Sequence, residues 1–217
     1  MPGMPPVVAR AMIRKPLICV NAWLPPCPDN GNTSNELIKD AKMDNFTPDF
    51  SLDVQGVKGF CPAGEVYAKQ QIEKKTIPVL SCEGPCIRGD IARLAANYIT
   101  QQVPALARAC HAETFFVPHS SMALWVKGAD KSVMIDGCFL KCHGRVLKEL
   151  VDEQKVIHID ALPLYRKYTD IFLMDDVPEE ERKAVARQVA EKVIAKLRHD
   201  GTLTARPAEP VAPRAVL

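Results

Sequence analysis

The sequence predicts an α/β fold with a mostly parallel sheet flanked by helices and with cysteine loops at the C-terminal edge of the strands. Short β-branched runs at 77–80, 131–136 and 155–160 alternate with segments whose apolar residues recur every three or four positions. Right-handed crossovers between such strands favour a parallel sheet that is buried on both faces. The stretches SCEGPC and DGCFLKC each follow one of these strands, so both are expected at the same edge of the sheet.

The chain is expected to divide into four parts. Residues 1–15 and 201–217 are rich in proline and lack periodicity, which is typical of flexible ends. Residues 16–75 contain an apolar strand at their start and then a poorly periodic insertion. Residues 76–200 carry the alternating strands and helices, and they form the predicted cysteine-rich α/β domain.

Within the N-terminal part, the run PLICVN predicts a strand at 16–21, and the Pro/Asn/Asp/Gly/Ser-rich residues 25–35 predict a loop. Cys19 lies inside that strand and is interpreted as structural. The run GEVYAKQQIEKK at 64–75 is typical of a helix.

The first strand of the domain is expected to run into a helix through a tight turn. Gly84 permits the turn, and Pro85 suits the first position of a helix. The apolar face of this helix consists of Ile87, Ile91, Leu94, Ala95, Tyr98 and Ile99. Two further helices are predicted, one at 103–112 and one at 120–127.

The same pattern is predicted twice more along the chain. The helix after the strand at 131–136 has an apolar face made by Phe139, Cys142, Val146, Leu147, Leu150 and Val151. After the strand at 155–160, Asp176, Pro178 and three glutamates predict a helix start. The face of that last helix continues through Val185, Val189, Val193, Ile194 and Leu197.

Charge and composition exclude several function classes. Lys plus Arg number 28 and Asp plus Glu 26, which gives a formal charge of +2 with both signs scattered, so no nucleic-acid partner is expected. Arg10, Arg14 and Lys15 interrupt the apolar N-terminus, so we expect no signal peptide, no membrane contact and a cytoplasmic location. Neither glycine-rich phosphate-loop motif occurs, which argues against nucleotide binding.

Four of the eight cysteines form two pairs at the strand-to-helix turns. Cys82 and Cys86 are four positions apart, and so are Cys138 and Cys142. A cysteine in the first turn of a helix is favoured as the thiolate, which is the form that binds metals. Four sulfurs from two such loops would suit a tetrahedral zinc site or an iron–sulfur cluster.

These motifs resemble the DGC-domain family, which is named for the tripeptide that stands here as Asp136, Gly137 and Cys138. The resemblance covers about residues 76–160 and rests on VMIDGCFLKC, on CEGPCIRGDIARLAAN and on Cys110 between them. It implies several cysteines held near one metal, with zinc expected. The additional cysteines at 27, 61 and 86 depart from the family pattern and leave the ligand set open.

Several residues have both a functional and a structural interpretation. Cys110 and His143 are candidate extra ligands, and each is equally well interpreted as a packed side chain. Asp136 either orients a ligand or, the preferred interpretation, caps the following turn or helix by accepting backbone N–H groups. Cys27 and Cys61 lie in Pro/Gly loops, where ligands and ordinary thiols look alike.

The leading hypothesis is a protein that binds zinc through Cys82, Cys86, Cys138 and Cys142, with a structural, metal-handling or metal-sensing role. An iron–sulfur or dithiol redox protein is the alternative, because thiolates serve both. A third hypothesis is an interaction module with buried cysteines. Four thiolates leave a zinc ion no open position, which argues against a hydrolase. A protein partner is compatible with each hypothesis, but the residues identify none and do not indicate an oligomeric state.

Overall fold

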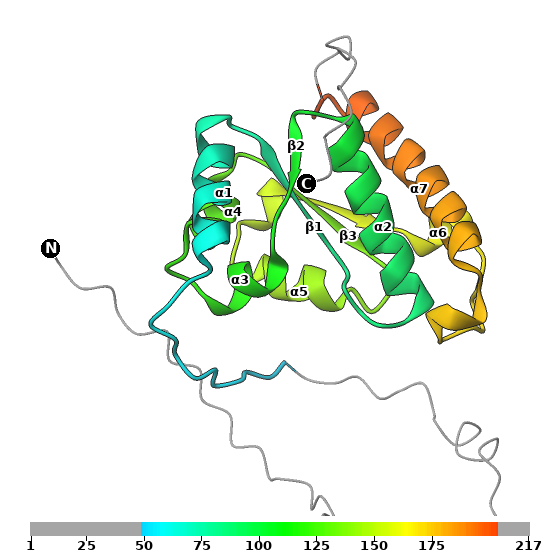
Figure 1. Ribbon diagram of the computed structural model, residues 1–217, viewed down its shortest axis with the longest axis horizontal. Coiled ribbons are helices and arrows are strands. Elements are labelled where there is room, and N and C mark those ends of the chain that lie inside the picture. Colours follow the sequence, from blue (N-terminus) through cyan, green and yellow to red (C-terminus); the bar gives the residue numbers. More distant parts are fainter. Residues whose placement is uncertain (1–48, 204–217) are drawn as a thin grey trace, which may run out of the picture. The chain divides into compact units, whose positions relative to one another are not determined.

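The computed structural model describes residues 49–203, and residues 56–203 form a unit built on a four-stranded sheet. The strands run parallel in the order β2-β1-β3-β4 (Figure 1). Their bounds are Ile77–Ser81 for β1, Leu106–Arg108 for β2, Ser132–Asp136 for β3 and Val156–Asp160 for β4. The predicted α/β fold with a parallel sheet and flanking helices is confirmed.

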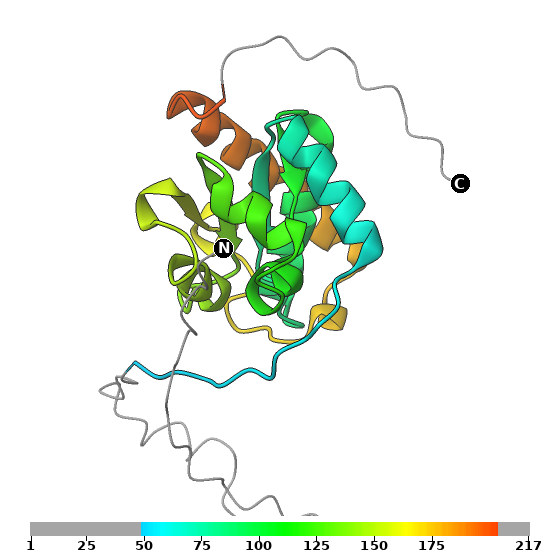
Figure 2. The same ribbon diagram turned by 90° about the vertical axis from the view of Figure 1, so that its left-hand side faces the viewer.

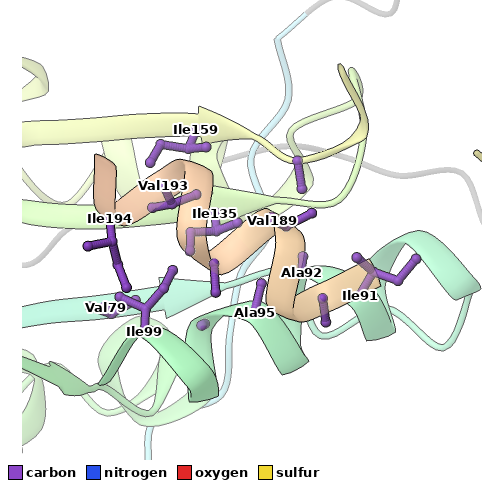
Figure 3. Packing of buried hydrophobic residues seen from close by; sticks show 14 of the residues in the cluster. Val79, Ile91, Ala92, Ala95, Ile99, Ile135, Ile159, Val189, Val193 and Ile194 are labelled. Atoms are coloured by element: carbon purple, nitrogen blue, oxygen red, sulfur yellow. The ribbon is translucent and has the colours of Figure 1, made fainter. Parts of the chain in front are cut away.

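Two long helices cover one face of the sheet. Helix α2 (Ile87–Gln102) and helix α7 (Glu179–His199) pack side by side there (Figure 1). Figure 3 shows side chains of the strands, of α2 and of α7 meeting in one buried layer, among them Val79, Ile135, Ile159, Ile91, Ala95, Val189 and Val193. The helical spacing predicted for both helices therefore marks their buried faces.

The opposite face of the sheet is covered by α1 (Pro62–Glu73) and α4 (Ser121–Gly128), which stand in front of the strands in Figure 2. Leu80 of β1 and Met134 of β3 point to this side, where they pack with Ala68 and Trp125. Successive residues of β1 and β3 thus face opposite layers, and both layers are apolar because a central parallel strand is buried on both sides.

Helix α1 is fixed at its start by a cysteine and by two glutamates, one of α3 and one of α1 itself. The sulfur of Cys61 accepts the N–H of Gly64 at 3.3 Å, so Cys61 is the N-cap of α1. Glu113 accepts the N–H of Cys61 at 3.3 Å, and Glu65 of α1 accepts the N–H of Ser121 at 2.6 Å. Cys61, which the sequence left open between ligand and loop thiol, therefore serves as a helix cap here.

The helix predicted at 103–112 is wrong, because part of this segment is the edge strand β2. Ala105 accepts the N–H of Ile77 at 2.9 Å, and Ala109 donates its N–H to Val79 at 3.0 Å. Hydrogen bonding to β1 thus overrides the helix propensity of an alanine-rich segment, as tertiary context often does. A short helix, α3 (His111–Phe116), begins only after the strand.

The helix after β3 starts later than its predicted apolar face. Helix α5 spans Cys142–Lys148, and Phe139, which was expected on that face, precedes the helix and is 70% exposed. Leu147 and Val151 do reach the core. The helix after β1 also starts later than expected, since Pro85 precedes the N-cap Cys86 of α2.

The remaining short elements are η1 (Glu153–Lys155), α6 (Leu162–Tyr165) and η2 (Met174–Asp176). The strand predicted at 16–21 lies outside the described residues, as do Cys19 and Cys27. Between residues 49 and 203, no helix is long and apolar enough to cross a membrane.

A buried carboxylate joins α2 to α7. Asp90, which is 3% exposed, lies 2.6 Å from Nη2 of Arg93 on its own helix and 2.5 Å from Nη1 of Arg182 on α7. The Arg182 side chain is only 12% exposed, so Asp90 neutralises a cation that has largely left water.

We expect Asp90→Asn to lower the free energy of unfolding by about 3–5 kcal/mol, because it leaves the Arg182 guanidinium buried without its counter-charge. Urea unfolding followed by circular dichroism measures this change. Glu180→Gln, which removes an exposed charge from the same helix α7, is the control and should leave the unfolding midpoint unchanged. Equal midpoints for the two variants would contradict this role of Asp90.

Candidate functional site

The two cysteine loops leave adjacent strands at the same edge of the sheet. Strands β1 and β3 pair directly, with Ser81 opposite Ile135. The pairing continues beyond β1, since the N–H of Cys82 donates to the carbonyl of Ile135 at 2.8 Å. Cys82 therefore lies beside the Asp-Gly-Cys turn that follows β3, and the predicted placement of both loops at one edge is confirmed.

Inside the first loop, two sulfurs approach the same glycine. A Cβ atom built on Gly84 would lie 3.5 Å from the sulfur of Cys82 and 4.0 Å from the sulfur of Cys86. Both sulfurs therefore lie next to one point in space, on the same side of the loop. Side chains at positions 82 and 86 can act on one ligand or on each other.

The backbones of the two loops are in direct contact at glycines. A Cβ on Gly137 would lie 2.6 Å from the carbonyl oxygen of Arg88, and a Cβ on Gly89 would lie 2.3 Å from that of Gly84. Neither position has room for a side chain without a backbone shift. Gly137 holds the turn after β3 against the start of α2, whereas Gly89 lets the start of α2 pack on Gly84 of its own loop. Cys138 therefore follows directly after the contact between the two loops.

The thiol of Cys82 is half-buried, and its burial raises its pKa above the ordinary value. The backbone N–H groups of Gly84 and Gly137 donate to this sulfur and act in the opposite direction, whereas the charges of Asp136 and Cys86 raise the pKa further. The resting form of Cys82 at neutral pH is therefore the thiol, with donors from both loops already directed at its sulfur.

Asp136 connects the turn after β3 to α5 and β4. Its Oδ2 accepts the N–H of Gly144, in the first turn of α5, at 3.1 Å and lies 2.6 Å from Nε2 of His158. The preferred interpretation of Asp136 as a capping residue is confirmed by the bond to Gly144. The residue is 1% exposed, and its other oxygen, Oδ1, is buried without a hydrogen-bond partner.

Burial and several neighbouring groups, Cys86 and Cys138 among them, change the pKa of Tyr165. Burial raises the pKa of the Tyr165 hydroxyl far above its usual value, and the Arg88 guanidinium opposes this increase. The charges of Cys86 and Cys138 raise it further. Tyr165 follows β4, and all three residues belong to segments that leave the carboxyl ends of neighbouring strands.

The other predicted ligands lie around α3 and α5. Cys142 is the first residue of α5, and Cys110 is the N-cap of α3; both are exposed. His143 packs against α3, since its ring centroid lies 4.8 Å from that of His111 with perpendicular planes. The structure therefore places His143 beside α3, and no described contact joins it to Cys82 or Cys86.

The described residues contain thiol donors but no assembled metal cage. Between residues 49 and 203, no three His, Cys, Asp or Glu side chains are gathered as a group that could hold a metal ion. The six cysteines in this range are free thiols. Thiols are suitable donors for zinc, but the described side chains are not close enough together to form its coordination shell.

Sequence reasoning missed Tyr165, and it left Arg88 and Glu83 open between contact with a substrate or the thiols and charges that face water. The Nε atom of Arg88 is buried. Tyr165 carries no motif, but it follows the fourth parallel strand, whose end lies at the same edge of the sheet. Only the position of β4 in the sheet could have indicated Tyr165. Oε1 of Glu83 lies 2.6 Å from Nη2 of the half-buried Arg108 and pairs with that charge.

We expect Gly144→Ala to destabilise the protein by about 1–3 kcal/mol through overpacking, because the new methyl group would lie 2.3 Å from Oδ2 of Asp136. Gly128→Ala at the end of α4 is the matched control. Nothing lies within 4 Å of its added Cβ, so it should raise stability by about 0.4–1 kcal/mol. Thermal unfolding checks both, and an unchanged Gly144→Ala variant would refute the close contact.

One of three comparisons with known proteins finds a match. A family model described as the DGC domain matches residues 78–196, which is more than half of the 217-residue chain. The match includes both cysteine loops, the Asp136-Gly137-Cys138 turn and Tyr165. No curated protein and no solved structure matches the chain in the corresponding comparisons. The chain belongs to the DGC-domain family.

Proposed function

We propose that this protein binds a thiophilic metal ion, with zinc as the expected ion, through the thiolates of Cys82, Cys86 and Cys138. One observation carries the proposal: the sulfurs of Cys82 and Cys86 flank Gly84, while Gly137 packs on Arg88 and brings the start of the second loop to the first. The three cysteines thus belong to adjoining loops at one edge of the sheet.

A role in metal handling or sensing fits this site better than a purely structural role. The apolar core on both faces of the sheet is complete without an ion. The three thiols lie at the edge, and they are not yet gathered into a coordination shell within the described residues. Metal binding would therefore reorganise the two loops rather than support folding of the whole domain.

The other predicted ligands remain predictions, because no described contact joins them to the three thiols. Cys142 and Cys110 are exposed on α5 and at the start of α3, and His143 packs against His111. With three thiolates, zinc would retain a fourth position for another donor. No reaction step is assigned to the ion.

A dithiol redox role is the second candidate, favoured by the approach of the Cys82 and Cys86 sulfurs to the same point beside Gly84. Oxidation would join the two sulfurs and pass two electrons and two protons to a disulfide of an oxidising partner. A Cys82–Cys86 disulfide found by mass spectrometry in the metal-free protein, together with no metal uptake, would favour this candidate over the metal site.

The metal content of the purified protein tests the proposal. We expect about one zinc ion per chain in the wild type, and a clear loss of zinc in Cys82→Ser, Cys86→Ser and Cys138→Ser, measured by elemental analysis after anaerobic purification. Cys61→Ser is the matched control. Serine is a good N-cap and replaces the capping sulfur of α1, so this variant should keep both its fold and its zinc.

Two results would contradict the zinc proposal. One is full zinc content in Cys138→Ser, which would show that the second loop supplies no ligand. The other is stoichiometric iron with broad visible absorption, which would indicate an iron–sulfur cluster on the same thiolates.

We also expect zinc affinity to rise with pH. Burial raises the pKa of Cys82, so a proton must leave its sulfur before a metal–sulfur bond forms. Competition titration with a chromophoric chelator should show tighter binding as pH increases from about 6 to about 8, with protons released on binding. Zinc affinity that is independent of pH over this range would exclude Cys82 as a ligand.

A further inference from the structure

Four buried side-chain polar atoms between residues 49 and 203 lack a hydrogen-bond partner: Nε of Arg88, Oδ1 of Asp136, Nδ1 of His143 and the hydroxyl of Tyr165. Those of Arg88, Asp136 and Tyr165 lie at or after the carboxyl ends of β1, β3 and β4, the edge of the sheet that carries the cysteine loops, whereas His143 packs against α3. An unpaired buried polar group costs about 1–3 kcal/mol, and native proteins keep few of them. Their concentration at one edge indicates that a ligand supplies the missing partners.

Two of these atoms are hydrogen-bond donors beside the thiols. Arg88 donates through Nη2 to the carbonyl of Thr169, in the segment that follows Tyr165, and Cys86 pairs with Leu173 of the same segment. Gly137, directly before Cys138, packs on the backbone of Arg88. Both Nε–H of Arg88 and O–H of Tyr165 are buried without an acceptor. The site therefore offers donors and requires a ligand that accepts.

The charge of Arg88 is held in place but not neutralised. Its Nη2 donates to the carbonyl of Thr169, which fixes the guanidinium. No Asp or Glu within the described residues forms an ion pair with it. A fixed guanidinium with a free Nε–H can bind two oxygens of one anion, which is the geometry that arginine uses for phosphate.

The neighbouring groups favour an oxyanion over a neutral ligand. Tyr165 stays a hydroxyl donor, because burial keeps its pKa far above neutral pH. Helix α2 begins at Ile87, and Cys86 makes no side-chain cap bond there, so the positive end of a sixteen-residue helix adds to the Arg88 charge. Asp160 also raises the pKa of Tyr165, and its negative charge opposes an anion, so the charge of Arg88 and the start of α2 have to outweigh it.

We propose that Arg88 and Tyr165 form a binding site for a tetrahedral oxyanion, either free phosphate or the phosphate group of a monoester, next to the thiols of Cys86 and Cys138. A tetrahedral oxyanion has acceptor oxygens for both the guanidinium and the hydroxyl. The inference does not depend on the metal proposal, because neither Arg88 nor Tyr165 is a metal ligand there.

Calorimetric titration of the full, metal-free chain with inorganic phosphate tests the site. We expect saturable binding to the wild type, and binding weaker by about tenfold or more in Arg88→Lys and in Tyr165→Phe, since each loses one charged or polar contact. The matched controls are Arg93→Lys on the same helix and Tyr168→Phe. The Tyr168 hydroxyl is bonded to Glu181 and should not contact the anion.

A parallel titration with phenyl phosphate distinguishes a free oxyanion from a phosphomonoester as the preferred ligand. Tighter binding of phenyl phosphate than of inorganic phosphate assigns the site to a monoester, and the reverse order assigns it to the free ion. Either order supports an oxyanion site, provided that Arg88→Lys and Tyr165→Phe both weaken the binding.

Alkylation of the wild-type protein gives a second readout that needs no variant. Phosphate should slow the reaction of iodoacetamide with Cys86 and Cys138 and leave Cys61 unaffected, as mapped by mass spectrometry. The proposal is overturned if the folded wild type binds neither phosphate compound at millimolar concentration. It is also overturned if both variants bind as tightly as their controls.

Discussion

The pairing of β1 with β3 is the constraint on which the rest of this site depends. It brings the ends of two strands side by side, with Ser81 opposite Ile135, although 50 residues separate these strands in the sequence. The turns that follow then meet at Gly137 and Arg88, where the backbones are too close for any side chain at position 137. The two cysteine loops consequently form one surface rather than two separate turns.

That surface differs from the core in how well its polar groups are satisfied. Asp90, buried between α2 and α7, has two arginine partners, whereas Asp136 keeps one buried oxygen without any. Buried polar groups are normally paired because leaving them unpaired is costly. The unpaired atoms of Arg88 and Tyr165 are therefore best explained by partners that arrive with a ligand, which is the basis of the oxyanion proposal.

The sequence was sufficient for β1, β3, β4 and the two long helices and for the shared edge of the cysteine loops, because apolar periodicity and parallel crossovers determine them, but it did not indicate the order of the strands in the sheet. It failed at β2, where an alanine-rich segment pairs with β1 instead of forming a helix, and at Phe139, which precedes α5. Contacts of single side chains, such as Arg88 with the carbonyl of Thr169 or His143 with His111, depend on tertiary packing and leave no periodic signal.

X-ray absorption spectroscopy of the zinc-loaded protein tests most directly whether the two loops act as one thiolate site. Our account predicts three sulfur neighbours at about 2.3 Å from zinc in the wild type. It predicts two sulfur neighbours in Cys138→Ser, with the sulfurs of Cys82 and Cys86 retained. A zinc shell made only of nitrogen and oxygen, or a sulfur count that Cys138→Ser leaves unchanged, would contradict it.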